Sequence, residues 1–433
     1  MKKTFKLFLI LFFAFSVKVK AQDGFHFINK NKVHQQISFK LINNLIVIPL
    51  HLNDKKLHFI LDTGVNKTIL FNISQNDSIG LNNVKKVKLQ GLGKGESIDA
   101  LMSLNNNVSI KKIASKTETI YVILKDNFDL SSKMGTTIHG IIGYDLLKEF
   151  ILKINYKSQT IDFYNPNKFK YRKCKKCEVF PLKLFRNKPY MNLKVQLDTI
   201  GNKLIDVKML IDSGGSDAVW LFEDSKEDIK TPKQFFNDIL GEGLSGAIYG
   251  NRSRMPKIKM GSFEIENPTV SFLDSLSTKN ARTFKDRNGS IGAGILKRFK
   301  VWIDYPNKKI TLKKSGSFSG GFNYNMSGLD VIYYGKQLVK EENVKSYSNN
   351  ASAGGENSIN FITSFSYKFK PSFIVNSVVE NSPAEKAGLL KDDIILKING
   401  KRSYEFTLND IMFKFQQRDN KKIKIEVSRN GKK

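Results

Sequence analysis

Cysteine is nearly absent from this chain, which has only Cys174 and Cys177 among its 433 residues. Two thiols in a Cys-Lys-Lys-Cys spacing supply too few ligands for a structural metal site, and no thioredoxin-like βαβ pattern surrounds them. We therefore predict no metal site and no redox role. The two residues are expected to be either an oxidised pair or two idle thiols.

Histidines and long apolar runs are also scarce. The five histidines end at His139, and neither a His-Glu-x-x-His motif nor a nucleophile elbow occurs, which disfavours zinc, serine and cysteine hydrolase mechanisms. No apolar run approaches the roughly 18 residues of a membrane-spanning helix. With 10 prolines and 40% hydrophobic residues the chain is neither collagen-like nor disordered, and its length predicts about three domains.

Acidic residues are outnumbered, because 40 Asp and Glu face 71 Lys and Arg, a net charge of +31. Sixty-one of the 71 basic residues are lysines, and they are spread along the whole chain. Nucleic-acid sites favour the arginine fork and a focused basic patch. We interpret the charge as a compositional bias on a solvated surface and expect no nucleic-acid partner.

The first residues are typical of a secretory signal. Lysines precede an apolar run over residues 7–17, which is too short to span a bilayer, and Val19 and Ala21 place small residues before a cleavage point. We predict a signal peptide over residues 1–21. The expected product is exported, either periplasmic or secreted, with no integral membrane segment after signal cleavage.

The chain repeats itself at an interval of about 150 residues. Each copy has an apolar strand-like run, a polar turn, and a second apolar run that ends in an Asp-Thr/Ser-Gly triplet. The triplets are Asp62-Thr63-Gly64 and Asp212-Ser213-Gly214. Further along, Ile141-Ile142-Gly143 corresponds to Ser290-Ile291-Gly292. The repeat predicts two similar β-rich lobes.

Composition divides the chain further. The Ser- and Gly-rich stretch after Lys314 predicts a flexible linker, and the polar residues 343–358 predict a mobile loop within the last unit. The expected segments are a signal peptide (1–21), an N-terminal lead (22–40), a first lobe (41–165), a connector (166–185), a second lobe (186–315), a linker (316–325) and a last unit (326–433).

The two aspartates are the candidate catalytic residues. Each follows an apolar strand, where partial withdrawal from water makes ionisation of a carboxylate costly. If a pseudo-twofold axis relates the lobes, Asp62 and Asp212 meet across it and share one proton. One can then act as a base towards a water while its protonated partner polarises a carbonyl. Four neighbours support them, because hydroxyls can tie the loops together and glycines permit tight turns: Thr63, Gly64, Ser213 and Gly214.

These motifs resemble those of a two-lobed aspartic peptidase of the pepsin and retropepsin type. The resemblance implies a mainly β fold with a duplicated, double-lobed acid-protease-like β-barrel domain. It also implies that an activated water hydrolyses peptide bonds without a cofactor, and that an extended peptide or protein substrate lies under a hairpin flap. The glycine-bearing segments in suitable positions for flap and substrate binding are Gly91, Leu92, Gly93, Gly241, Glu242 and Gly243.

The last unit follows an ordered pattern. A strand over residues 373–379 precedes Ser382-Pro383, which suits a helix start, and a second amphipathic helix is expected over 408–416. This pattern resembles a PDZ domain, a β-rich domain with two short helices in which a peptide adds beside a strand edge. The nearest match to its carboxylate-binding loop contains Gly328 and Leu329.

The sequence therefore predicts an exported aspartic endopeptidase that acts as a monomer, with a PDZ domain for peptide docking or regulation. A C-terminal peptide is the expected ligand of the PDZ domain. The alternative is a catalytically silent peptide-binding scaffold that uses the same lobes and PDZ domain.

Overall fold

The computed structural model describes residues 24–73, 79–91, 97–124, 130–199, 201–243, 246–349 and 358–432. The predicted signal peptide over residues 1–21 lies outside these ranges. Strands dominate the described residues and the helices are short, so the predicted mainly β fold class is confirmed. None of the helices in this part of the chain is long and apolar enough to cross a membrane.

The first lobe is built on a nine-stranded sheet with the order β1-β9-β6-β10-β5-β4-β8-β7, in which β3 pairs with β4. Two short helices, α2 (Leu130–Met134) and α3 (Tyr144–Leu147), flank β10 in the chain. The strands are β1 (His26–Phe27), β3 (Lys40–Ile42), β4 (Leu45–Leu52), β5 (Lys55–Leu61), β6 (Thr68–Leu70), β7 (Lys85–Leu89), β8 (Ile98–Ile110), β9 (Ile113–Ile123) and β10 (Gly140–Ile142).

The second lobe repeats this plan in a ten-stranded sheet with the order β18-β19-β22-β17-β23-β16-β15-β20-β21, in which β14 pairs with β15. Its helices are α4 (Ser275–Thr278), η1 (Ala281–Thr283) and α5 (Ala293–Leu296). The strands are β14 (Lys183–Phe185), β15 (Lys188–Gln196), β16 (Ile205–Ile211), β17 (Val219–Phe222), β18 (Phe236–Gly243), β19 (Gly246–Arg254), β20 (Lys257–Met260), β21 (Phe263–Glu266), β22 (Thr269–Leu273) and β23 (Gly289–Ile291).

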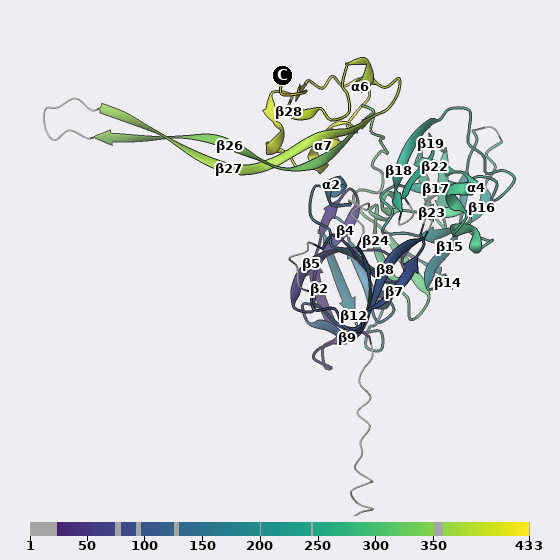
Figure 1. The fold of residues 1–433 in the computed structure, drawn as a ribbon. Helices are drawn as coiled ribbons and strands as arrows, with labels where there is room; N and C mark the ends of the chain where they lie inside the picture. The colour runs from purple at the N-terminus through teal and green to yellow at the C-terminus, as the bar shows by residue number, and fades with distance from the viewer. Residues whose placement is uncertain are drawn as a thin grey trace, which may run out of the picture.

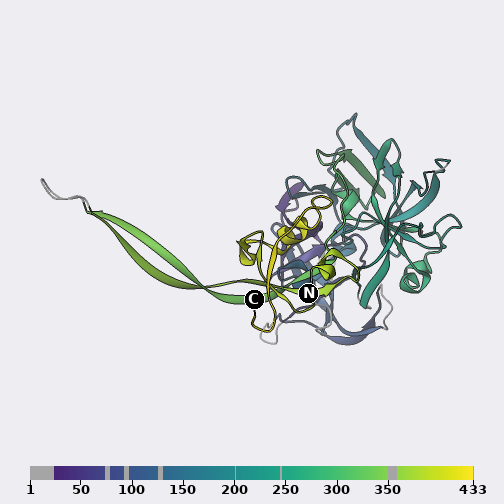
Figure 2. The ribbon, with the colours of Figure 1, turned by 90° about the horizontal axis from the view of Figure 1, so that it is seen from above.

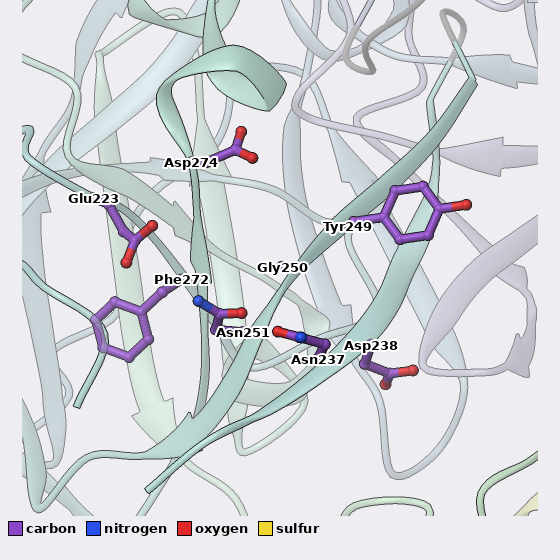
Figure 3. A pocket seen from close by; sticks show the side chains of 8 residues that line it. All are labelled: Glu223, Asn237, Asp238, Tyr249, Gly250, Asn251, Phe272 and Asp274. Carbon is purple, nitrogen blue, oxygen red and sulfur yellow. The ribbon is translucent and has the colours of Figure 1, made fainter. Parts of the chain in front are cut away.

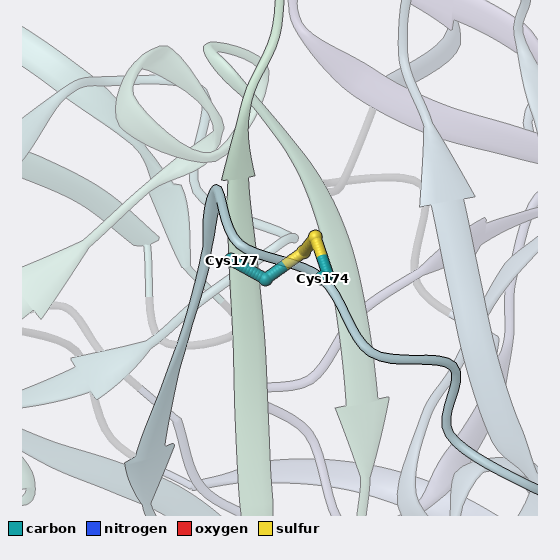
Figure 4. The surroundings of a disulfide bond; sticks show 2 residues. All are labelled: Cys174 and Cys177. Atoms are coloured by element: carbon teal, nitrogen blue, oxygen red, sulfur yellow. A yellow bond between two sulfur atoms is a disulfide. The ribbon is translucent and has the colours of Figure 1, made fainter.

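A third sheet joins the lobes, with the order β13-β25-β24-β11-β12-β2. The strand β2 lies in the predicted N-terminal lead, and β13 lies in the predicted connector, where a disulfide joins Cys174 and Cys177 at its start (Figure 4). One hydrophobic core runs through both lobes and this sheet. The strands are β2 (His34–Ser38), β11 (Ile151–Asn155), β12 (Thr160–Tyr164), β13 (Cys177–Pro181), β24 (Phe299–Asp304) and β25 (Lys309–Lys314).

The C-terminal unit has its own core and a five-stranded sheet with the order β26-β27-β28-β29, in which β30 pairs with β28. Side chains cap both of its helices as their residue types predict: Ser382 accepts from the Glu385 amide, and Thr407 from the Asp410 amide. The elements are β26 (Leu329–Asn349), β27 (Ser358–Val378), α6 (Pro383–Lys386), β28 (Ile394–Ile398), β29 (Lys401–Arg402), η2 (Ser403–Glu405), α7 (Leu408–Lys414) and β30 (Ile425–Ser428).

The mobile loop predicted for residues 343–358 is wrong for residues 343–349 and for Ser358, which lie in strands, while residues 350–357 lie outside the described residues. The strand β26 continues through Asn349 and β27 starts at Ser358, with unbroken pairing from Lys336 opposite Pro371 to the ends of both strands. The polar residues that suggested a loop find cross-strand partners, because Asn343 donates to the Ser366 hydroxyl at 3.1 Å. The result is a long two-stranded arm that extends away from the lobes in both views (Figure 1, Figure 2).

The flexible linker predicted after Lys314 is wrong as well. The Arg298 side chain donates to the carbonyl oxygens of Phe318 and Gly321 at 3.0 and 2.9 Å and stacks on the Phe322 ring. Arg254 donates to the Phe322 carbonyl at 2.7 Å. The buried Arg298 needs acceptors, and the carbonyls of this small-residue segment supply them, so the segment is held against the second lobe.

Candidate active site

Asp62 and Asp212 occupy equivalent places in the two lobes. Asp62 directly follows β5 and Asp212 directly follows β16, and each of these strands pairs in parallel with β10 or β23. The backbone amides of the two aspartates donate to the carbonyls of Ile142 and Ile291, both at 2.9 Å. The same local pattern of an apolar strand, an acid and an apolar segment further along thus places both acids at matching strand ends.

The hydroxyl residues after the aspartates cross-link the lobes. Thr63 Oγ1 donates to the Ile211 carbonyl at 2.6 Å and accepts from the Ser213 amide at 3.0 Å. In the mirror arrangement, Ser213 Oγ donates to the Leu61 carbonyl at 2.8 Å and accepts from the Thr63 amide at 3.0 Å. Thr63 and Ser213 are 1% and 0% exposed, so four hydrogen bonds in a dry environment fix the loops that carry the acids.

The two carboxyl groups lie together above this cross-link. The carboxyl groups of Asp62 and Asp212 both lie against Gly64. The Gly64 amide donates to Asp62 Oδ1 at 2.6 Å, and the Gly214 amide donates to Asp212 Oδ1 at 3.1 Å. The approach is too close for a side chain: a Cβ on Gly64 would lie 2.9 Å from Asp212 Oδ1 and 3.1 Å from Asp62 Oδ1, and one on Gly214 would lie 2.2 Å from Asp62 Cγ.

The electrostatic consequence is an acid that keeps a proton. Burial, and then the negative charge of Asp212, raise the pKa of Asp62 to about 8, while the Gly64 amide and the positive charge of Lys188 act in the opposite direction. Two neighbouring carboxyls in such surroundings hold one proton between them. The pair therefore presents one acid and one base at the same place.

Comparisons with known proteins agree with this geometry. The aspartyl protease family model matches residues 48–146 and again residues 197–296, so each lobe matches separately. A PDZ domain model matches residues 374–429. The two lobes belong to the aspartyl protease family, and the C-terminal unit is a PDZ domain.

Among the similar solved structures is the crystal structure of an aspartic proteinase from Irpex lacteus, at 13% sequence identity. The match covers 66% of this chain and 99% of that chain, with a TM-score of 0.46. A comparison with curated proteins finds no match.

A lysine beside the dyad distinguishes the second aspartyl protease lobe from the first. Lys188 lies two residues before Tyr190, whose partner Leu210 lies two residues before Asp212. In the first lobe the corresponding place belongs to Leu45, because Val47 pairs with Ile60. Sequence reasoning missed Lys188, because its correspondence to Leu45 follows from the strand register and not from the 150-residue interval.

Two further residues near the dyad were also missed. Arg287 is 4% exposed and donates to the Ser290 hydroxyl at 2.7 Å. This bond explains why the second copy has serine where the first has Ile141. The buried Tyr305 donates to the Thr63 carbonyl at 3.3 Å, which adds a third element to the floor of the site.

The predicted flap residues are divided between described and undescribed parts of the chain. Leu92 and Gly93 lie outside the described residues. Gly91 lies two residues after Leu89, which ends β7 and pairs with Ile98 of β8. Asn280 of the second lobe donates to the Gly91 carbonyl at 3.0 Å. Gly241, Glu242 and Gly243 end β18, which forms a hairpin with β19.

A cavity of about 300 Å³ lies at the β18–β19 hairpin and contains neither catalytic candidate (Figure 3). It is lined by Glu223, Asn237, Asp238, Tyr249, Gly250, Asn251, Phe272 and Asp274. Within the described ranges no group of three His, Cys, Asp or Glu residues is arranged to hold a metal ion.

The PDZ residues predicted for peptide binding lie at the start of β26. The Gly328 carbonyl accepts from the Val379 amide at 2.8 Å, and its φ of 76° suits glycine. The Leu329 side chain is 2% exposed in the PDZ core. Its amide donates to the Ser327 hydroxyl at 3.1 Å, and its carbonyl accepts from the Asn325 side chain at 2.6 Å.

The PDZ domain also contacts the first lobe. Asn409 in α7 accepts from the Asn43 amide at 3.3 Å, and the next residue, Asn44, donates to the Ser216 carbonyl at 2.9 Å. Ser216 lies four residues after Asp212. In addition, α2 packs against β26. A short series of contacts therefore runs from the PDZ domain to the loop of the second aspartate.

Proposed function

We propose that the two lobes form a working aspartic endopeptidase. The observation that carries this proposal is the convergence of the two carboxyl groups above the Thr63–Ser213 cross-link, where a Cβ on Gly64 would lie within 3.1 Å of an Oδ1 atom of both Asp62 and Asp212. Two carboxyl groups held at this separation can activate one water between them, which requires no metal ion and no nucleophilic side chain.

The proposed reaction assigns a separate role to each acid. Asp62 has the raised pKa and holds the shared proton, which it donates towards the oxygen of the scissile carbonyl. Asp212, as carboxylate, removes a proton from the water, and the resulting hydroxide adds to the carbonyl carbon. The tetrahedral intermediate breaks its C–N bond as Asp212 returns its proton to the leaving amine. Asp62 then regains a proton as the new carboxyl group forms.

We further propose that the PDZ domain docks a peptide, such as a C-terminal tail, beside β26. This strand ends its sheet, and no described strand pairs with its outer edge. A peptide can extend such an edge with main-chain hydrogen bonds. Because α2 packs against β26, a docked peptide would also come close to the first lobe.

Export is the last part of the proposal. The signal-like residues 1–21 support it, and so does the disulfide between Cys174 and Cys177, since disulfides persist in oxidising compartments. Fractionation of producing cells, with N-terminal sequencing of the product, tests it. A product in the soluble cell interior that retains Met1 would contradict export.

Peptide hydrolysis by Asp62→Asn and Asp212→Asn variants tests catalysis. On a library of internally quenched peptides, we expect each variant to lose about 10²- to 10⁴-fold in kcat, the range for loss of an acid or base. Asp206→Asn, at an exposed ion pair with Lys194, is the matched control and should keep full activity. A statine-type transition-state mimic should inhibit the unmodified protein.

Retained turnover in Asp212→Asn would contradict the proposed mechanism. If the unmodified chain binds peptides in its lobes but cleaves none of the library, the catalytically silent scaffold is favoured instead.

A further inference from the structure

The arm formed by β26 and β27 has one apolar face. Residues directly opposite each other in an antiparallel pair point to the same side, and sides alternate along each strand. From the register in which Leu338 faces Phe369 and Val344 faces Thr363, one side carries six apolar side chains, all more than half exposed. They are Leu338 (59%), Val344 (57%), Phe361 (68%), Phe365 (54%), Tyr367 (65%) and Phe369 (70%). We call this set the aromatic stripe.

The opposite face of the arm is largely polar. There Glu341 pairs with Lys368 at 2.6 Å and with Lys370 at 2.9 Å. Asn343 donates to Ser366 on the same face. The contrast between the faces is that of an amphipathic ribbon.

No residue in the described part of the chain covers the aromatic stripe. Its six side chains are 54–70% exposed, and both views show the arm extending away from the lobes (Figure 1, Figure 2). A two-stranded ribbon is at best marginally stable alone, and contiguous exposed apolar patches mark interaction sites. The stripe therefore calls for a partner outside this fold.

The charges beside the stripe decide what kind of partner fits. Lys336 and Lys340 lie on the apolar face, with Glu342 as the acid among the described residues of that face, and Lys340 Nζ lies 3.7 Å from the centroid of the Phe365 ring. A dry interface between two copies would bury two lysines and one glutamate from each arm, which leaves unpaired positive charge. Two copies at +31 each would also repel.

An anionic membrane surface satisfies the same groups. Aromatic rings insert at the level of the headgroups, while lysine stems extend along them and place their ammonium groups at lipid phosphates. Residues 336–371 include five lysines and three glutamates, and this net positive charge adds attraction to acidic lipids. We propose that the arm docks this protein on an anionic membrane surface through its aromatic stripe.

Co-sedimentation of the full chain with lipid vesicles tests the proposal. We expect binding to vesicles of phosphatidylcholine mixed with phosphatidylglycerol, and much weaker binding to phosphatidylcholine alone. Replacing three rings of the stripe, Phe361→Ser, Phe365→Ser and Phe369→Ser together, should lower the partition coefficient by at least about tenfold, because this removes most of the inserted apolar area.

The matched control removes apolar groups from the opposite face. Tyr347→Ser with Ile362→Ser, at residues that are 49% and 56% exposed, should bind as the unmodified chain does. If the triple variant does not fold, Lys336→Glu with Lys340→Glu gives a second test and should also lower binding to the acidic vesicles.

Three results would overturn the proposal: no binding to acidic vesicles, equal loss from both faces, or a stable dimer in ultracentrifugation that the stripe variant abolishes. The last result would identify a second copy as the partner. Vesicle binding does not depend on peptide hydrolysis, so the outcome is independent of the proposed catalysis.

Discussion

Replacing Ser213 by alanine removes a single hydroxyl, but it should destabilise the lobes strongly. The Ser213 hydroxyl donates to the Leu61 carbonyl and accepts from the Thr63 amide, and both partners belong to residues that are at most 1% exposed. Its loss leaves two buried backbone groups without this partner. Each such group costs about 1–3 kcal/mol, so the expected loss in the free energy of unfolding is about 2–6 kcal/mol.

Urea unfolding followed by tryptophan fluorescence measures this loss, because both tryptophans, Trp220 and Trp302, lie in the lobes. Ser213→Thr keeps the hydroxyl and copies the residue of the first lobe, so it should cost much less. Ser158→Ala removes a hydroxyl whose hydrogen bond to Thr160 is exposed, and the change should stay within about 0.5 kcal/mol.

The reasoning fails if Ser213→Ala costs less than about 1 kcal/mol, or if Ser213→Thr costs as much. Either outcome would mean that water or backbone rearrangement replaces the hydroxyl. Peptide hydrolysis should fall together with stability in Ser213→Ala, since Leu61 and Thr63 flank Asp62.

Three other perturbations have defined outcomes. Activity should fall as pH rises through the raised pKa of Asp62, and because the charge of Lys188 lowers that pKa, Lys188→Met should move this upper limb of the pH–rate profile to higher pH. Asn280→Ala removes the bond to Gly91 across the lobes, so KM should rise by up to about tenfold, the effect of one hydrogen bond, with kcat changed less. Arg298→Met should free the segment before the PDZ domain and raise the radius of gyration in small-angle X-ray scattering.

Surface variants of the same residue types are the controls. Lys183→Met, at an exposed lysine, is the control for Lys188→Met. Arg418→Met, at an exposed arginine, is the control for Arg298→Met. An unmoved upper limb in Lys188→Met, an unchanged KM in Asn280→Ala, or an unchanged radius in Arg298→Met would each contradict the contact from which the prediction is drawn.

Local patterns were enough to locate the centre of the candidate site. An apolar strand followed by Asp-Thr/Ser-Gly and a distant apolar-Gly segment occurs twice, and the structure brings the acids of both copies together. The cross-link between Thr63 and Ser213 follows from the same symmetry. What repeats in the sequence also repeats in the fold.

Residues that break the symmetry were beyond the sequence. Lys188 and Arg287 near the dyad depend on strand register and on packing between elements, and neither belongs to a motif. The predictions for the arm and for the segment after Lys314 were wrong because polar and small residues, considered alone, predict a flexible backbone. Cross-strand pairing holds the arm, and the buried Arg298 holds the segment after Lys314. Both kinds of contact join residues that are distant in the sequence, so a local sequence pattern does not indicate them.

The Arg298 contacts have a consequence for substrate choice. A docking domain on a flexible linker accepts substrates of many lengths. A docking domain that is held against the two lobes instead fixes the distance between the docking site and the aspartates. If a protein tail binds beside β26, its cleavable bond must be separated from that tail by a nearly constant distance. If the lobes cleave peptides as proposed, shorter substrates would then fail to reach the aspartates, and cleavage would be selective for spacing as well as for side chains.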